Sequence, residues 1–189
     1  MRREALDNLR QLYRAKNQMT KLYGVLQRLH ESSPNEAPIT ADLARLGLNL
    51  GEDTETCHQL AKEAYDREPN DSDCAITYGF SLNRLGRNQE ALAIVQSLSP
   101  EHPHDAHAAV YVALMFAEGN QLEEARHYIA VAERGKIYPE EKKLLEEAKA
   151  KVASAPAIPL PAESSPSASN ARSSRTAGTT WWEPRSSTD

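Results

Sequence analysis

SDCAITYGFSLNRLGRNQEALAIVQSLSPEHP, residues 72–103, carries two helical patterns of apolar residues joined by a short break. The break is Gly86-Arg87-Asn88, and its glycine tolerates the positive φ that a tight turn between helices needs. Pro103 closes the stretch, because proline cannot continue a helix interior. The stretch therefore predicts a helix pair, marked by Tyr78, Gly79 and Leu82 in its first helix and by Ala91, Val95 and Leu98 in its second.

The same pattern recurs one 34-residue step away on both sides. Small residues fall in register where two helices must cross closely, and large ones where a helix fills the gap to its neighbour. Gly51, Gly86 and Gly119 are expected to make the turns. One helix pair cannot bury its apolar face alone, so such repeats stack into a solenoid. The residues in register include Ala41, Ala75 and Ala109; Leu48, Leu82 and Phe116; and Cys57, Ala91 and Ala125.

These residues resemble the tetratricopeptide repeat family. The family shows a large–small residue pair and an aromatic or leucine in its first helix, then small and apolar residues in its second. The resemblance covers about residues 3 to 153. It implies an all-α, right-handed α-solenoid of antiparallel helix pairs. The matching positions are Tyr78-Gly79, Leu82, Ala91, Val95, Leu98 and Pro103, and then Val112-Ala113, Phe116, Ala125, Ile129 and Ala132.

Prolines and glycines end the predicted helices and so divide the chain into repeats. The last predicted helix has Pro139 in its first turn and acids near its positive end, and it looks like the cap that a solenoid needs. The Ala/Pro/Ser-rich end of the chain cannot bury enough apolar surface to order itself, which predicts a disordered tail. The expected parts are a degenerate first repeat at 1–37, repeats at 38–71, 72–105 and 106–138, a capping helix at 139–153 and the tail at 154–189.

Composition excludes several classes of function. A net charge of −5 leaves no basic stripe for a phosphate backbone, so nucleic acid is not expected as a partner. No stretch reaches the roughly 18 apolar residues that a membrane span needs. Cys57 and Cys74 are too few for a disulfide framework, which favours a soluble protein in a reducing compartment, the cytoplasm.

The resemblance implies a noncatalytic scaffold or adaptor that binds a protein or peptide. The chain contains no P-loop, GxSxG, HExxH or GxGxxG motif, so neither an enzyme nor a cofactor is expected. The alternative is the C-terminal regulatory or scaffolding region of a larger enzyme or transport protein, since a repeat-like helix begins almost at Met1. The sequence does not indicate an oligomeric state.

By the same resemblance, partners lie along the concave surface formed by the first helices. Phe80 is expected either to anchor a peptide there or to pack against the next helix. A lysine–asparagine clamp for a carboxylate, known in the family, is not expected, because Asp42 and Ile76 stand where its lysine would be. The expected concave residues are Asp42, Leu46, Asn49, Asp73, Ile76, Phe80, Asn83, Arg84, His107, Val110 and Leu114.

Two further clusters stand out in the sequence. His102, His104 and His107 have the density of a metal site, but Pro103 spaces them awkwardly and a polar helix start explains them better, so no metal is expected. Trp181-Trp182 stand in a polar tail. Tryptophan is enriched in binding hot spots, so the pair is expected to be a short docking motif, to fold back onto the helices or to be a neutral chain end.

Overall fold

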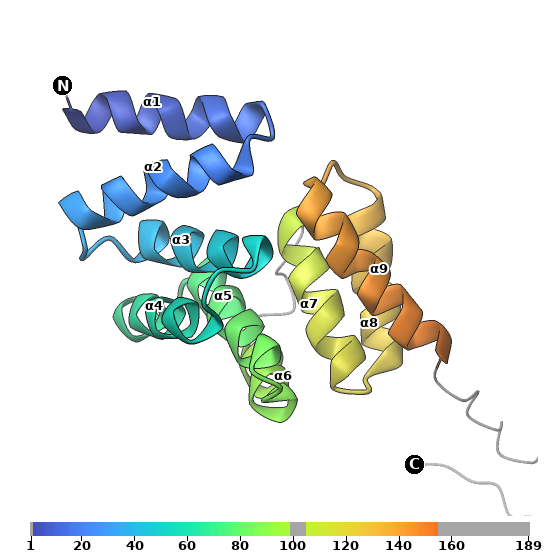
Figure 1. Ribbon diagram of the computed structural model, residues 1–189. Helices are drawn as coiled ribbons and strands as arrows, with labels where there is room; N and C mark the ends of the chain where they lie inside the picture. The colour runs from blue at the N-terminus through green and yellow to red at the C-terminus, as the bar shows by residue number, and fades with distance from the viewer. Residues whose placement is uncertain (1, 99–104, 155–189) are drawn as a thin grey trace, which may run out of the picture. The chain divides into compact units, whose positions relative to one another are not determined.

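The computed structural model describes residues 2–98 and 105–154 of the chain, and within these residues every regular element is an α-helix (Figure 1). The predicted tail falls outside this part from residue 155 onward, and so do Trp181, Trp182, His102 and His104. The helices are α1 (Arg2–Ala15), α2 (Met19–Ser32), α3 (Ala37–Leu50), α4 (Thr54–Arg67), α5 (Ser72–Arg84), α6 (Asn88–Ser97), α7 (Ala106–Glu118), α8 (Leu122–Glu133) and α9 (Pro139–Ser154).

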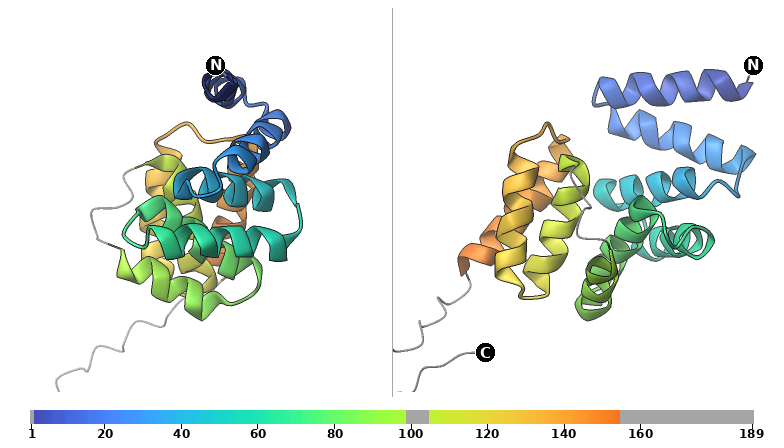
Figure 2. Two further views of the ribbon diagram at one scale, coloured as in Figure 1. Left: turned by 90° about the vertical axis from the view of Figure 1, so that its left-hand side faces the viewer. Right: turned by 180° about the vertical axis from the view of Figure 1, so that it is seen from behind.

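The helices form a row of stacked antiparallel pairs, which confirms the predicted α-solenoid (Figures 1 and 2). The first helices contact one another in sequence, α3 with α5, α5 with α7 and α7 with α9. Each second helix also contacts the first helix of the next pair, as α4 does with α5. Every pair is thus covered by its neighbour, as a repeat that cannot bury its own apolar face requires.

Short polar residues and positive-φ turns set the limits of these helices. Asp53, Asp71 and Asp105 cap α4, α5 and α7, each side chain accepting a hydrogen bond from a backbone N–H three residues on. Gly51 and Gly86 adopt positive φ as predicted. The prediction for Gly119 was wrong. Its φ is −78°, and the next residue, Asn120, takes the left-handed conformation with φ of 61°.

The residues in register form the core. Cys57, Ala91 and Ala125 are buried at the helix crossings, and Leu82 is buried between pairs. A Cβ on Gly79 would lie 2.9 Å from Met115 Sδ, so the small residue beside Tyr78 lets α5 and α7 approach. No helix in the described part is long and apolar enough to cross a bilayer.

The first pair departs from this stacking. Among the described helices, the backbone of α1 packs only against α2, whereas α3, α5 and α7 each pack against the next first helix. Long side chains on α1 reach across to α3 and to the residue before it. One of these is Arg3, which forms an ion pair with Glu36 just before α3 (2.6 Å).

Candidate functional site

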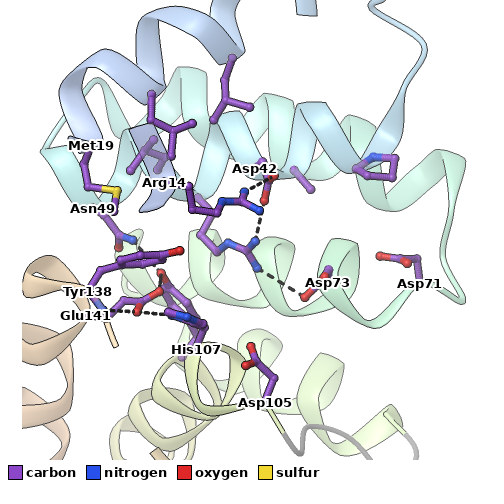
Figure 3. Close-up of a pocket in the computed structure, with 17 residues that line it drawn as sticks. Arg14, Met19, Asp42, Asn49, Asp71, Asp73, Asp105, His107, Tyr138 and Glu141 are labelled. Atoms are coloured by element: carbon purple, nitrogen blue, oxygen red, sulfur yellow. Dashed lines mark hydrogen bonds and ion pairs between the residues drawn. The ribbon is translucent and has the colours of Figure 1, made fainter. Parts of the chain in front are cut away.

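A cleft of about 270 Å³ lies where α1 leaves α3 uncovered (Figure 3). Side chains from α1, α2, α3 and α7 line it, together with residues at the starts of α5 and α9. Its apolar part is formed by Met19, Leu22, Leu26 and Leu46, and polar side chains make the rest. This volume lies near the lower end of the range for small-molecule pockets, about 300–1,000 Å³, and suits one or two side chains.

Arginines and aspartates cross one side of the cleft in a chain of ion pairs (Figure 3). Asp42 accepts from Arg14 at 2.8 Å and from Arg45 at 2.7 Å, and Arg45 also lies 3.5 Å from Asp73. Burial alone would raise the pKa of the Asp42 carboxyl, but the two guanidinium groups hold it below its ordinary value. The Arg45 guanidinium also lies 5.7 Å from the Tyr111 ring centroid, within cation–π range.

The other side is organised around the buried carboxylate of Glu141, at the start of α9. It accepts a hydrogen bond from the backbone N–H of Tyr138 at 2.9 Å, the reach-back of a capping box. It also accepts from the Tyr111 hydroxyl at 3.1 Å, and its Oε2 lies 2.6 Å from His107 Nδ1. Asn49 in turn donates to the Tyr111 hydroxyl at 2.7 Å, so this network ties α3, α7 and α9 together.

His107 contributes an imidazole with a shifted pKa to this network. Its hydrogen bond with Glu141 raises the pKa of the imidazole above its usual value, burial opposes this, and the charge of Glu141 adds to the rise. Nearby, Asp105 raises this pKa and Arg45 lowers it. The ring also stacks on Tyr138, with centroids 4.4 Å apart. His107 therefore has a larger charged fraction near neutral pH than a free histidine.

The repeat pattern and the stacked pairs are matched by known proteins. A tetratricopeptide repeat family model matches residues 52–115. Residues 52–115 therefore have the sequence pattern of this repeat family. A search of curated protein sequences finds no match.

Several solved structures share the fold. MamA, residues 41 to the end, from Desulfovibrio magneticus RS-1 has 17% sequence identity and a TM-score of 0.51, over 80% of this chain and 93% of that one. A MamA RS-1 ArsTM double mutant has 16% identity and a TM-score of 0.50, over 80% and 92%. YrrB, described as a tetratricopeptide repeat protein with an unusual peptide-binding site, has 16% identity and a TM-score of 0.50, over 78% and 74%. At these identities the likeness shows the fold.

The predicted concave residues of these repeats fall into three groups. Asp42, Leu46, Asn49, Asp73 and His107 all line the cleft. A second hollow, of about 250 Å³, is lined by several side chains that include Asn83, Arg84 and Leu114. The remaining three, Ile76, Phe80 and Val110, are buried in the core.

Phe80 illustrates the buried group. It is fully enclosed, and its ring centroid lies 4.8 Å from that of Tyr111. Of the two roles left open by the sequence, this placement matches packing against the next tetratricopeptide helix. Ile76 and Val110 are enclosed in the same way, so in this structure none of the three presents its side chain to a partner.

Sequence reasoning missed seven of the eleven polar side chains that line the cleft. They are Arg14, Arg45, Asp71, Asp105, Tyr111, Tyr138 and Glu141, and the last two lie at or beyond the end of the last complete repeat of the sequence pattern. The 34-residue repeat spacing would have identified Glu141. His107 is 34 residues after Asp73, and Glu141 is 34 residues after His107.

Metal and thiol chemistry find no support in the described residues. No group of three or more histidine, cysteine or acidic side chains there has the spacing to hold a metal ion. Cys57 and Cys74 are buried free thiols, and burial raises their pKa values to about 11 and about 12. Thiols with such pKa values carry little thiolate at neutral pH and are poor nucleophiles.

Proposed function

We propose that the chain is a noncatalytic interaction module whose cleft binds a segment of a partner protein. The single observation that carries this proposal is the uncovered side of α3, where α1 does not pack. A solenoid normally closes this position with the preceding first helix, here α1. Here the position holds an open hollow with an apolar part and fixed polar groups, the combination found in ligand sites.

The polar groups of the cleft are already oriented before a partner arrives. Asp42 is held by two arginines, and Tyr111 by Asn49 and Glu141. Preorganised groups bind better because less side-chain entropy is lost on association. One acceptor is still unused, since Asn49 Oδ1 is shielded from solvent and has no hydrogen-bond partner in the described part of the chain. A donor from a bound peptide would satisfy it.

Peptide selection with a blocked cleft tests the proposal. The full chain is used to select binders from a random peptide library displayed on phage. Binding is then compared with Pro38→Trp, in which an exposed residue lining the cleft becomes a bulky one without a change of charge. Gln59→Trp is the matched control, because Gln59 is exposed on α4 and lines neither hollow.

We expect selected peptides to bind the wild-type chain and Gln59→Trp equally, and to bind Pro38→Trp much more weakly. Helical circular dichroism equal to that of the wild type shows that both variants are folded. Selected peptides that bind Pro38→Trp undiminished would contradict the proposal, and so would a failure to select any peptide.

A further inference from the structure

The cleft is strongly acidic for a module of modest charge. Five carboxylates line it, against the two arginines Arg14 and Arg45. The cleft therefore holds an excess of three negative charges when His107 is neutral and of two when His107 is protonated, in a chain whose net charge is −5. The carboxylates belong to Asp42, Asp71, Asp73, Asp105 and Glu141.

Three of these carboxylates form what we call the acidic rim: Asp71, Asp73 and Asp105, labelled in Figure 3. Asp71 accepts from the Cys74 N–H at 2.8 Å and Asp105 from the Ala108 N–H at 3.3 Å, so capping fixes both side chains at helix starts. No lysine or arginine among residues 2–98 and 105–154 forms an ion pair with either of them. Asp73 is 64% exposed, and its contact with Arg45 is long, at 3.5 Å.

The two arginines are not available to an acidic ligand. Both already pair with Asp42, at 2.8 and 2.7 Å, and Arg45 also lies over the ring of Tyr111. An incoming carboxylate would have to displace Asp42 and would then face the rim, where like charges repel. An incoming cation is attracted instead, because the rim carboxylates of Asp71 and Asp105 form no ion pair with a lysine or arginine in the described part of the chain.

We infer that the segment bound in the cleft is basic. A lysine or arginine side chain fits both parts of the cleft, since its aliphatic stem packs on apolar surface while its charged end stays among polar groups. Leu46 and the partly exposed ring of Tyr138 provide apolar surface in the cleft, and the acidic rim provides the charge. This inference rests on the proposed function, because it concerns the chemistry of the partner at the same cleft.

Matched peptides of opposite charge test the inference. Short peptides, capped at both ends, alternate either lysine with alanine or glutamate with alanine, and their binding to the full chain is measured by calorimetry. The rim variants are Asp71→Asn, Asp73→Asn and Asp105→Asn. Asparagine caps helices as well as aspartate does, so the variants at 71 and 105 remove charge and keep the cap. Asp53→Asn is the control, because Asp53 caps α4 in the same way but lies outside the cleft.

We expect the lysine peptide to bind and the glutamate peptide not to bind. Each rim variant should weaken lysine-peptide binding by about two- to fivefold, the effect of removing a largely exposed ion pair. Asp53→Asn should leave it unchanged, and added salt should weaken it through screening. Equal binding of both peptides, or equal losses in Asp53→Asn and the rim variants, would overturn the inference.

The outcomes separate this inference from the proposed function. If library-selected peptides lose binding to Pro38→Trp but the lysine peptide does not bind, the cleft is a binding site and the basic partner is wrong. If no peptide distinguishes Pro38→Trp from the wild type, both fail.

Discussion

The pair between His107 and Glu141 should make the attachment of α9 dependent on pH. Glu141 is buried with only 4% of its side chain exposed, and the imidazole of His107 lies 2.6 Å from it. A hydrogen bond between charged groups stabilises by about 1.5–3 kcal/mol. Because 33% of the histidine side chain is exposed, solvent screening lowers our expectation to about 1–2 kcal/mol.

The sign of the pH dependence follows from the direction of the shift. The pKa of His107 is raised in the folded chain, above the value of about 6.5 for an unperturbed histidine. The stabilisation is therefore complete below about pH 6.5 and is lost as the pH rises through the folded-state pKa of His107. Asp105 and Arg45 also act on this histidine, so the Glu141 contribution must be isolated.

A double-mutant cycle isolates the contribution of the His107–Glu141 pair to the free energy of unfolding. Urea unfolding of the full chain is followed by circular dichroism for the wild type, His107→Gln, Glu141→Gln and the double variant, at about pH 6 and about pH 9. We expect a coupling free energy of about 1–2 kcal/mol at the lower pH and a clearly smaller one at the higher pH. A coupling energy that is the same at both pH values would refute the reasoning.

Three further outcomes test the packing. Phe80→Ala should lower the free energy of unfolding by about 3–5 kcal/mol in urea titrations, because the ring is fully buried; a loss below about 1 kcal/mol would show that it is not core. Gly47→Ala should cost about 1–3 kcal/mol, since its Cβ would lie 2.6 Å from Cys57 Sγ, and Cys57→Ala in the same chain should recover part of the loss. The thiols of Cys57 and Cys74 should react with iodoacetamide far more slowly in the native chain than in urea, given pKa values of about 11 and about 12; equal rates would contradict their burial.

Periodicity predicted the fold because it reflects burial directly. The repeat length of the solenoid determines where small and large apolar residues recur. Examples are Leu82, Ala91 and Ala125, which are all buried as expected. The turn at 119–120 shows the limit of such reasoning. Glycine and asparagine both tolerate positive φ, and the structure places Asn120 there while Gly119 keeps a negative φ.

The cleft was harder to predict than the fold. Repeat alignment assigned Asp42, Asn49 and His107 to the concave face, and all three line the cleft. It gave the same assignment to Phe80, because alignment places a residue on a helix face without showing whether a neighbouring helix covers it. The position of Arg14 depends on how α1 diverges from α3, which no local pattern encodes.

Nuclear magnetic resonance mapping of a selected peptide on the full chain tests the central claim most directly. If the cleft is the binding site, addition of the peptide should shift the side-chain amide of Asn49 and the imidazole of His107, together with backbone amides around Asp73. Exposed positions on second helices, such as Gln59 on α4 and Arg126 on α8, should stay unchanged. Shifts confined to the second helices, with Asn49 and His107 unaffected, would contradict the account.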